Sequence, residues 1–152
     1  MGLVLFPGDG DDGTPDVSWS YSGFAVFRRR PAEAEGFDLS EMRGFGGERL
    51  WTEVSTALEP LLDHPGTGGA DLPPAACASM LGRLREIIER WVAESAGDPR
   101  LRRAQEDARR LAEVLRLCVE KDVPHTPDRS RRAWGPGGPT YGESRCCCRG
   151  GR

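Results

Sequence analysis

Two apolar stripes in this chain mirror each other about a single point, the junction between Gly97 and Asp98. In both stripes the residues step at three and four positions, so each stripe lies on one face of a helix. Folding the chain back at the junction would bring the two faces into register. The facing sets are Cys77, Met80, Leu84, Ile87 and Trp91 before the junction and Cys118, Leu115, Leu111, Ala108 and Ala104 after it. The pattern predicts an antiparallel helical hairpin over residues 73 to 122, with Cys77 and Cys118 at the same level.

The turn of this hairpin has the residues that helix ends prefer. Gly97 suits the left-handed position that closes a helix, and Asp98 suits the N-cap of the next one. Pro99 follows, and proline is favoured at the first helical position because its missing N–H would have no partner there. We therefore expect one helix to end just before Gly97 and the other to begin at Pro99.

The first part of the chain predicts extended structure. Leu3 to Phe6 is a short apolar run that suits a buried strand, and Val17 to Tyr21 alternates larger side chains with serines, which indicates an extended segment leading into a helix. A loop rich in Gly, Pro and Asp separates the two segments. We expect one short strand or extended segment at the N-terminus.

Two further segments carry helical patterns. From about residue 22 a helix would present Phe24 and Phe27 on one face, and Pro31 is expected to kink or end it because an interior proline removes a hydrogen bond. Between Trp51 and Leu62 the apolar residues lie at helical spacing, which predicts another helix. The expected fold is mainly α: the hairpin packed with one or two further helices.

Length and charge indicate one domain followed by a tail. A chain of 152 residues suits one domain, which we place at residues 1–124. Residues 1–125 carry 15 basic and 22 acidic side chains, a net charge of −7, whereas residues 126–152 carry 6 and 2, a net charge of +4. The region 125–152 is rich in Gly, Pro, Arg and Cys and poor in apolar residues, so a disordered basic tail is predicted there.

The sequence also bears on the compartment. No apolar stretch approaches the roughly 18 residues that cross a bilayer, and the first residues lack the pattern of a secretory signal. Two of the five cysteines lie in the apolar stripes and the other three are adjacent at positions 146–148, so no disulfide framework is evident. A cytoplasmic protein without membrane contact is expected.

The familiar catalytic motifs are missing. A P-loop needs a lysine after its glycine-rich turn, and Lys121, the only lysine, would end a helix. There is no Gly-x-Ser-x-Gly elbow, and the two histidines lie in a loop and in the tail. No cofactor is predicted, and the chain is more readily interpreted as a protein without enzymatic activity.

One loop leaves a metal-dependent enzyme open as an alternative. It holds several carboxylates after the first apolar run: Asp9, Asp11, Asp12 and Asp16. The loop partly resembles the motifs of haloacid-dehalogenase-type phosphatases and EF-hands, but glycine or threonine stands where each motif needs an acid. Weak binding of Ca²⁺ or Mg²⁺ competes with the interpretation of a solvated turn.

A second alternative is a small nucleic-acid-binding protein that uses the run Arg28 to Arg30 and the basic tail. Along the hairpin, however, acidic side chains alternate with the arginines and would repel phosphates. Nucleic acid is therefore a disfavoured partner.

The segment from Asp16 through Glu53, together with Leu115 to Pro124, resembles a group of small uncharacterised actinobacterial proteins. The resemblance covers about residues 1–124 and implies no activity or catalytic residue. Members of that group carry leucine where Pro31 stands and end soon after the position of Pro124 with a short apolar segment. Pro31 and the tail are departures from the group.

The leading hypothesis is a non-enzymatic protein that binds another protein, of the small acidic immunity or adaptor kind. Its binding surface would lie near four aromatic residues: Trp19, Tyr21, Phe45 and Trp51. Aromatic side chains are frequent anchors in interfaces. They are also frequent in cores, so the competing interpretation is that these residues simply cover the core.

Overall fold

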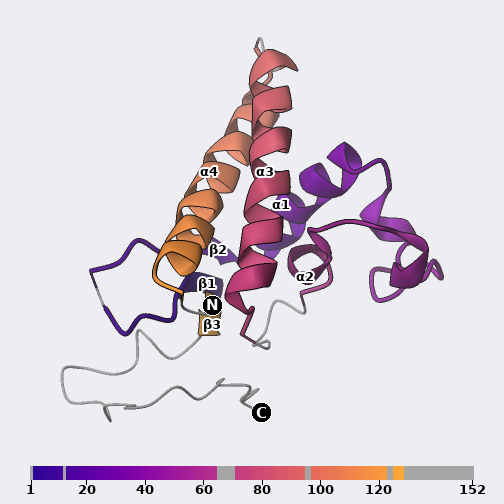
Figure 1. Ribbon diagram of the computed structural model, residues 1–152. Coiled ribbons are helices and arrows are strands. Elements are labelled where there is room, and N and C mark those ends of the chain that lie inside the picture. The colour runs from indigo at the N-terminus through magenta and orange to yellow at the C-terminus, as the bar shows by residue number, and fades with distance from the viewer. Residues whose placement is uncertain (1, 12, 65–70, 95–96, 123–124, 129–152) are drawn as a thin grey trace.

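The computed structural model describes residues 2–11, 13–64, 71–94, 97–122 and 125–128, and its fold is mainly α (Figure 1). Two long antiparallel helices dominate it, α3 (Pro74–Glu94) and α4 (Pro99–Glu120). They form a hairpin whose tip projects beyond the other elements, while a small sheet and the remaining helices gather around its lower half.

This hairpin confirms the prediction made from the two mirrored apolar stripes. All ten residues of the two stripes are buried, and the helices pack closely along their length. At the turn, Gly97 has a φ of 114°, and the Asp98 carboxylate accepts a hydrogen bond of 2.9 Å from the Arg100 N–H. The helix therefore begins at Pro99 with the N-cap that the sequence predicts.

A three-stranded antiparallel sheet lies at the foot of the hairpin, in the order β2 (Val17–Ser20), β1 (Gly2–Pro7), β3 (His125–Asp128). The register of the first pair places Leu3 opposite Trp19. The third strand was not predicted: the domain was expected to end at residue 124, whereas residues 125–128 pair with β1. The rest of the expected tail, residues 129–152, lies outside the described residues.

Helix α1 (Tyr21–Ala34) follows directly from β2, and the Ser20 hydroxyl caps it by accepting a 3.0 Å hydrogen bond from the Gly23 N–H. Pro31 was expected to kink or end the helix, and it does not end it, since α1 runs to Ala34. Pro31 and Ala32 are buried, and the Pro31 carbonyl accepts from the Glu35 N–H at 2.9 Å. Burial and this hydrogen bond hold the last turn despite the missing proline N–H.

Between α1 and α3, the described residues 35–64 and 71–73 contain only short helical pieces. These are η1 (Leu39–Glu41), η2 (Trp51–Glu53) and α2 (Glu59–Leu62). The helix expected over residues 51–62 is therefore wrong in its middle part. Pro60 has no N–H to donate to the preceding turn and fits only the first turn of a helix, so a continuous helix is broken before α2.

One apolar core joins these elements. Helix α4 contacts both β1 and β2, while α1 packs against α2, α3 and α4. The inward residues of the sheet, Leu3, Leu5 and Val17, belong to the same buried cluster as the stripes of the hairpin. The sheet and the shorter helices thus pack against the long hairpin and share one core with it.

Candidate functional site

The predicted aromatic surface is divided between the core and the loops. Trp19 on β2 is only 8% exposed, and its ring stacks on Phe27 with centroids 5.0 Å apart and touches Phe24 at 5.4 Å. Its location is that of a core residue. Tyr21, at the start of α1, is half-buried.

The other two aromatic residues lie together. Phe45 and Trp51 are both half-buried, with ring centroids 6.2 Å apart in an edge-to-face arrangement. Trp51 also meets the buried ring of Phe37 edge-to-face at 6.1 Å. Beside them Leu50 is 41% exposed, the only large apolar side chain of this loop among the exposed ones that the structure describes. We call Phe45, Leu50 and Trp51 the aromatic loop patch.

The loop beneath this patch has a defined backbone. The Arg43 N–H donates to the Arg49 carbonyl at 2.8 Å, and the Arg49 N–H donates to the Glu41 carbonyl at 2.9 Å. Gly47 packs so tightly against the backbone of Glu41 that a Cβ atom would overlap the Glu41 carbonyl. Phe45 therefore lies in a closed turn whose ends are hydrogen-bonded to each other, and Trp51 follows directly after it.

Arg28 connects this loop to two other segments. It is 8% exposed, and its Nη1 donates to the carbonyls of Leu62 and His64 just after α2, the first at 3.1 Å. Its Cζ lies over the Phe24 ring at 4.5 Å and over the Phe45 ring at 4.8 Å. One guanidinium thus ties α1 to the end of α2 and to the aromatic loop patch through hydrogen bonds and cation–π contacts.

Burial lowers the pKa of the Arg28 guanidinium from its ordinary value, although nearby Asp63 opposes this shift. Burial also lowers the pKa of His64, and the positive charge of Arg28 lowers it further. His64 is therefore held neutral in the folded protein, with its ring edge-to-face to Phe24 at 6.0 Å. Together Arg28, His64 and Phe24 connect α1 to the end of α2 inside the fold.

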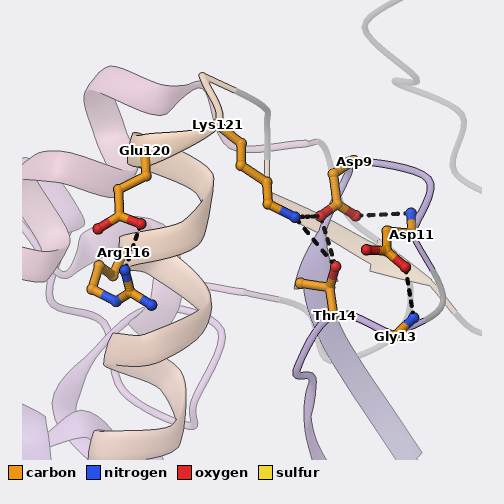
Figure 2. A network of polar contacts seen from close by, with 7 residues as sticks. All are labelled: Asp9, Asp11, Gly13, Thr14, Arg116, Glu120 and Lys121. Carbon is orange, nitrogen blue, oxygen red and sulfur yellow. Dashed lines mark hydrogen bonds and ion pairs between the residues drawn. The ribbon is translucent and has the colours of Figure 1, made fainter.

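The aspartate loop between β1 and β2 is arranged around a lysine (Figure 2). The Asp9 carboxylate accepts from the Asp11 N–H at 3.0 Å through Oδ1, and from the Thr14 hydroxyl at 2.8 Å and Lys121 Nζ at 2.6 Å through Oδ2. Burial acts to raise the pKa of Asp9, but the hydrogen bonds from Lys121, Thr14 and Asp11 outweigh it and hold the pKa below the ordinary value. Lys121, the first residue after α4, therefore binds the loop that joins the two N-terminal strands.

This arrangement bears on the predicted metal ligands. Both oxygens of Asp9 already accept hydrogen bonds, one of them from an ammonium group, whereas Asp11 and Asp16 are exposed. Asp12 lies outside the described residues. Within the described ranges, no group of three or more His, Cys, Asp or Glu side chains is placed to hold a metal ion.

The ion pair between Lys121 and Asp9 should stabilise the folded protein. Replacing Lys121 with methionine should lower the thermal unfolding midpoint near neutral pH, because the nearly buried Asp9 carboxylate loses its cationic partner. Since the pKa of Asp9 is lowered in the folded state, its contribution is complete above the ordinary value of 3.8 and is lost as the pH falls below it. Thermal unfolding followed by circular dichroism should therefore show a difference between wild type and Lys121→Met that shrinks below about pH 4.

A matched control for this variant lies on the same helix. Arg110 pairs with Glu106 at 2.7 Å, but both side chains are more than 60% exposed, against 7% for Asp9. Exposed pairs of this kind contribute little. Arg110→Met should leave the midpoint nearly unchanged, and equal effects of the two variants would show that burial of Asp9 does not matter.

Lys121 was not predicted as a site residue, and Arg28 was considered only as part of a basic run for nucleic-acid binding. Arg28 stands four residues after Phe24 and one after Phe27, so its position on the buried face of α1 was a usable signal. Its burial also removes it from the run Arg28 to Arg30 that was considered for nucleic-acid binding. Arg30 of the same run is paired with Glu33 at 3.0 Å.

In the ranges that the structure describes, no helix combines the length and apolar character needed to cross a membrane. Comparison with protein families, with curated proteins and with solved structures finds no match to this chain. Its function therefore has to be inferred from its own residues.

Proposed function

We propose that this chain is a non-enzymatic cytoplasmic protein of the immunity or adaptor kind, and that it binds another protein through the aromatic loop patch. The observation that carries the proposal is the grouping of Phe45, which lies in a closed turn, with Leu50 and Trp51, which follow the turn directly. Two of the side chains are half-buried rings, and the third is an exposed leucine. The resemblance of residues 1–124 to small actinobacterial proteins remains a prediction beside it.

The geometry of the turn favours recognition. A surface whose backbone is already ordered loses less conformational entropy when a partner binds, so more of the contact energy appears as affinity. Here the Arg43–Arg49 and Glu41–Arg49 hydrogen bonds close the turn, and Arg28 holds the Phe45 ring from beneath. These contacts support a preformed patch.

The composition of the patch also favours a protein partner. Aromatic residues with a polar rim are typical of interface centres. Around Leu50 the rim includes Arg49, which lies 3.6 Å from the Glu41 carboxylate and 4.0 Å from that of Glu53. An apolar centre within mixed charges suits a protein surface better than a polyanion, whose phosphates would be repelled by the glutamates.

The test compares a patch variant with a matched surface variant. Leu50→Ser removes the exposed apolar side chain of the patch, and Val26→Ser removes one that is 62% exposed on α1. Partners recovered with the wild-type chain from its host would be purified and titrated against all three proteins. We expect Leu50→Ser to weaken binding by about tenfold or more and Val26→Ser to leave it unchanged.

Trp51→Ala provides a second arm. Because Trp51 is half-buried, its replacement could disturb the fold. Circular dichroism and urea unfolding of the Trp51→Ala protein must therefore first show that it is folded. A partner that binds Leu50→Ser and folded Trp51→Ala as tightly as wild type would exclude the aromatic loop patch as the binding surface. If none of the recovered proteins binds the wild-type chain in the titration, the adaptor role itself is contradicted.

A further inference from the structure

Cys77 and Cys118 face each other at the lower end of the hairpin. Cys77 lies in the first turn of α3 and Cys118 in the last turn of α4, at mirrored positions about the Gly97–Asp98 junction. Both side chains are fully buried, at 0% exposure. The structure therefore encloses two thiols between the terminal turns of two packed helices.

The two thiols are in contact. The pKa of the Cys118 thiol is raised because its hydrogen bond with the Cys77 sulfur favours the protonated form, and burial and the charge of Asp9 raise it further. Cys77 Sγ also lies 3.7 Å from the Leu72 carbonyl, to which it donates. The Cys77 and Cys118 side chains are thus held next to each other.

The spacing of packed helices is compatible with a covalent link at this position. Helix axes in contact lie about 8–10 Å apart, and each Cα lies about 2.3 Å from its axis, so directly facing residues approach to roughly 3.5–5.5 Å between Cα atoms. Disulfides span Cα separations of about 4.4–6.8 Å.

We propose that Cys77 and Cys118 form an intramolecular disulfide when the protein meets a peroxide, and that this bond ties the first turn of α3 to the last turn of α4. The pair would then be an oxidation site, distinct from the aromatic loop patch. Its modified form would fasten the end of α4, where Lys121 binds the Asp9 loop (Figure 2).

The reaction balances with hydrogen peroxide as the oxidant. One cysteine, as the thiolate, attacks a peroxide oxygen, the O–O bond breaks, and the departing hydroxide takes up a proton to leave water and a sulfenic acid. The second sulfur attacks the sulfenic sulfur, the S–S bond forms, the S–O bond breaks, and a second water leaves. Two thiols are oxidised to one disulfide and one peroxide is reduced to two waters.

The terminal position of the pair gives the oxidant access. Fully buried, protonated thiols react slowly, since the thiolate is the nucleophile. Helix ends open locally at a lower free energy than the rest of a fold, and both cysteines lie in terminal turns. Oxidation should therefore proceed through brief opening of the hairpin base rather than through global unfolding.

The experiment uses the full chain with Cys146, Cys147 and Cys148 replaced by serine, so that only the buried pair can react. The folded protein is treated with hydrogen peroxide, remaining thiols are alkylated, and the chain is digested with trypsin without reduction. We expect a linked pair of peptides, residues 50–83 joined to 117–121, that reduction separates. The thermal midpoint of the oxidised protein should rise by several degrees and return on reduction.

Controls separate a specific bridge from general oxidation. Cys77→Ala and Cys118→Ala in the same background should give no linked peptide, and circular dichroism during treatment should keep the helical signal. If both thiols are alkylated after treatment, or are oxidised separately to sulfinic acids in the folded protein, the proposal is wrong and the pair only fills the core. A link that forms only above the unfolding midpoint would overturn it equally.

Discussion

Replacement of Arg28 by alanine should lower the free energy of unfolding by about 3–4 kcal/mol, far more than expected for an arginine in a run of three. The side chain is 8% exposed and contacts three separate segments. The truncation leaves a cavity under Phe24 and Phe45 and removes the donor from the carbonyls of Leu62 and His64.

The contributions to this loss can be ranked. A buried carbonyl without its donor costs about 1–3 kcal/mol, and a desolvated cation–π contact contributes up to about 2 kcal/mol. Against this, burial penalises the charged guanidinium, as its lowered pKa indicates, and that penalty disappears in the variant. Because Arg28 meets both aromatic rings and a buried carbonyl, the lost contacts outweigh the relief.

A series of variants at this position separates the causes. Arg28→Met retains most of the volume but no donor, so it should fall between wild type and alanine in urea unfolding. The neighbouring Arg29 is exposed, and Arg29→Ala should change stability by less than about 0.5 kcal/mol. If Arg28→Ala lowered the free energy of unfolding no more than Arg29→Ala, the contacts of Arg28 with the end of α2 and with the aromatic loop patch would not stabilise the fold.

The hairpin could be predicted because its signal is local and repeated. Ten apolar positions at helical spacing and a turn with glycine, aspartate and proline agree with one another, and tertiary contacts only reinforce them. The N-terminal strands were accessible for a similar reason, since the alternation at Val17 to Tyr21 is confined to a few residues. For both features, local residue preferences and the spacing of apolar residues indicate the same structure.

The errors arose where tertiary contacts or competing local signals decide. Pro31 stays within α1 because its neighbours are buried, which composition cannot reveal. In the segment 51–62 the apolar spacing is helical, but Pro60 breaks the helix and Thr56 Oγ1 accepts from the Leu58 N–H at 3.0 Å. Strand β3 depends on pairing with β1, more than a hundred residues earlier, and carries no apolar pattern of its own.

The candidate site was predicted only in part. Phe45 and Trp51 do lie together, but Trp19 was grouped with them by residue type, and its place in the core depends on stacking with Phe27. The aspartates of the first loop suggested a cation, and the cation that Asp9 binds is the ammonium of Lys121, 112 residues away in sequence. Contacts at such separation have no local signal in one sequence.

The second large effect concerns a glycine of the turn that presents the aromatic loop patch. Gly47→Ala should destabilise the protein by about 2–4 kcal/mol, because the new methyl group would overlap the Glu41 carbonyl, which is backbone and cannot rotate away. The φ of Gly47 is not in the left-handed region, so the penalty comes from close approach of two backbone segments. Relieving it requires the turn to open and lose its Arg49 hydrogen bonds.

Gly82 provides the opposite expectation for the same substitution. It lies within α3, is exposed, and has no heavy atom within 4 Å of an added Cβ. Alanine there should stabilise the protein by about 0.5–1 kcal/mol, since it reduces the entropy that a helical glycine loses on folding. Urea unfolding of both variants therefore tests the turn directly: opposite signs support the tight contact between Gly47 and Glu41, whereas a neutral Gly47→Ala would mean that the turn is not closed and that the aromatic loop patch is not preformed.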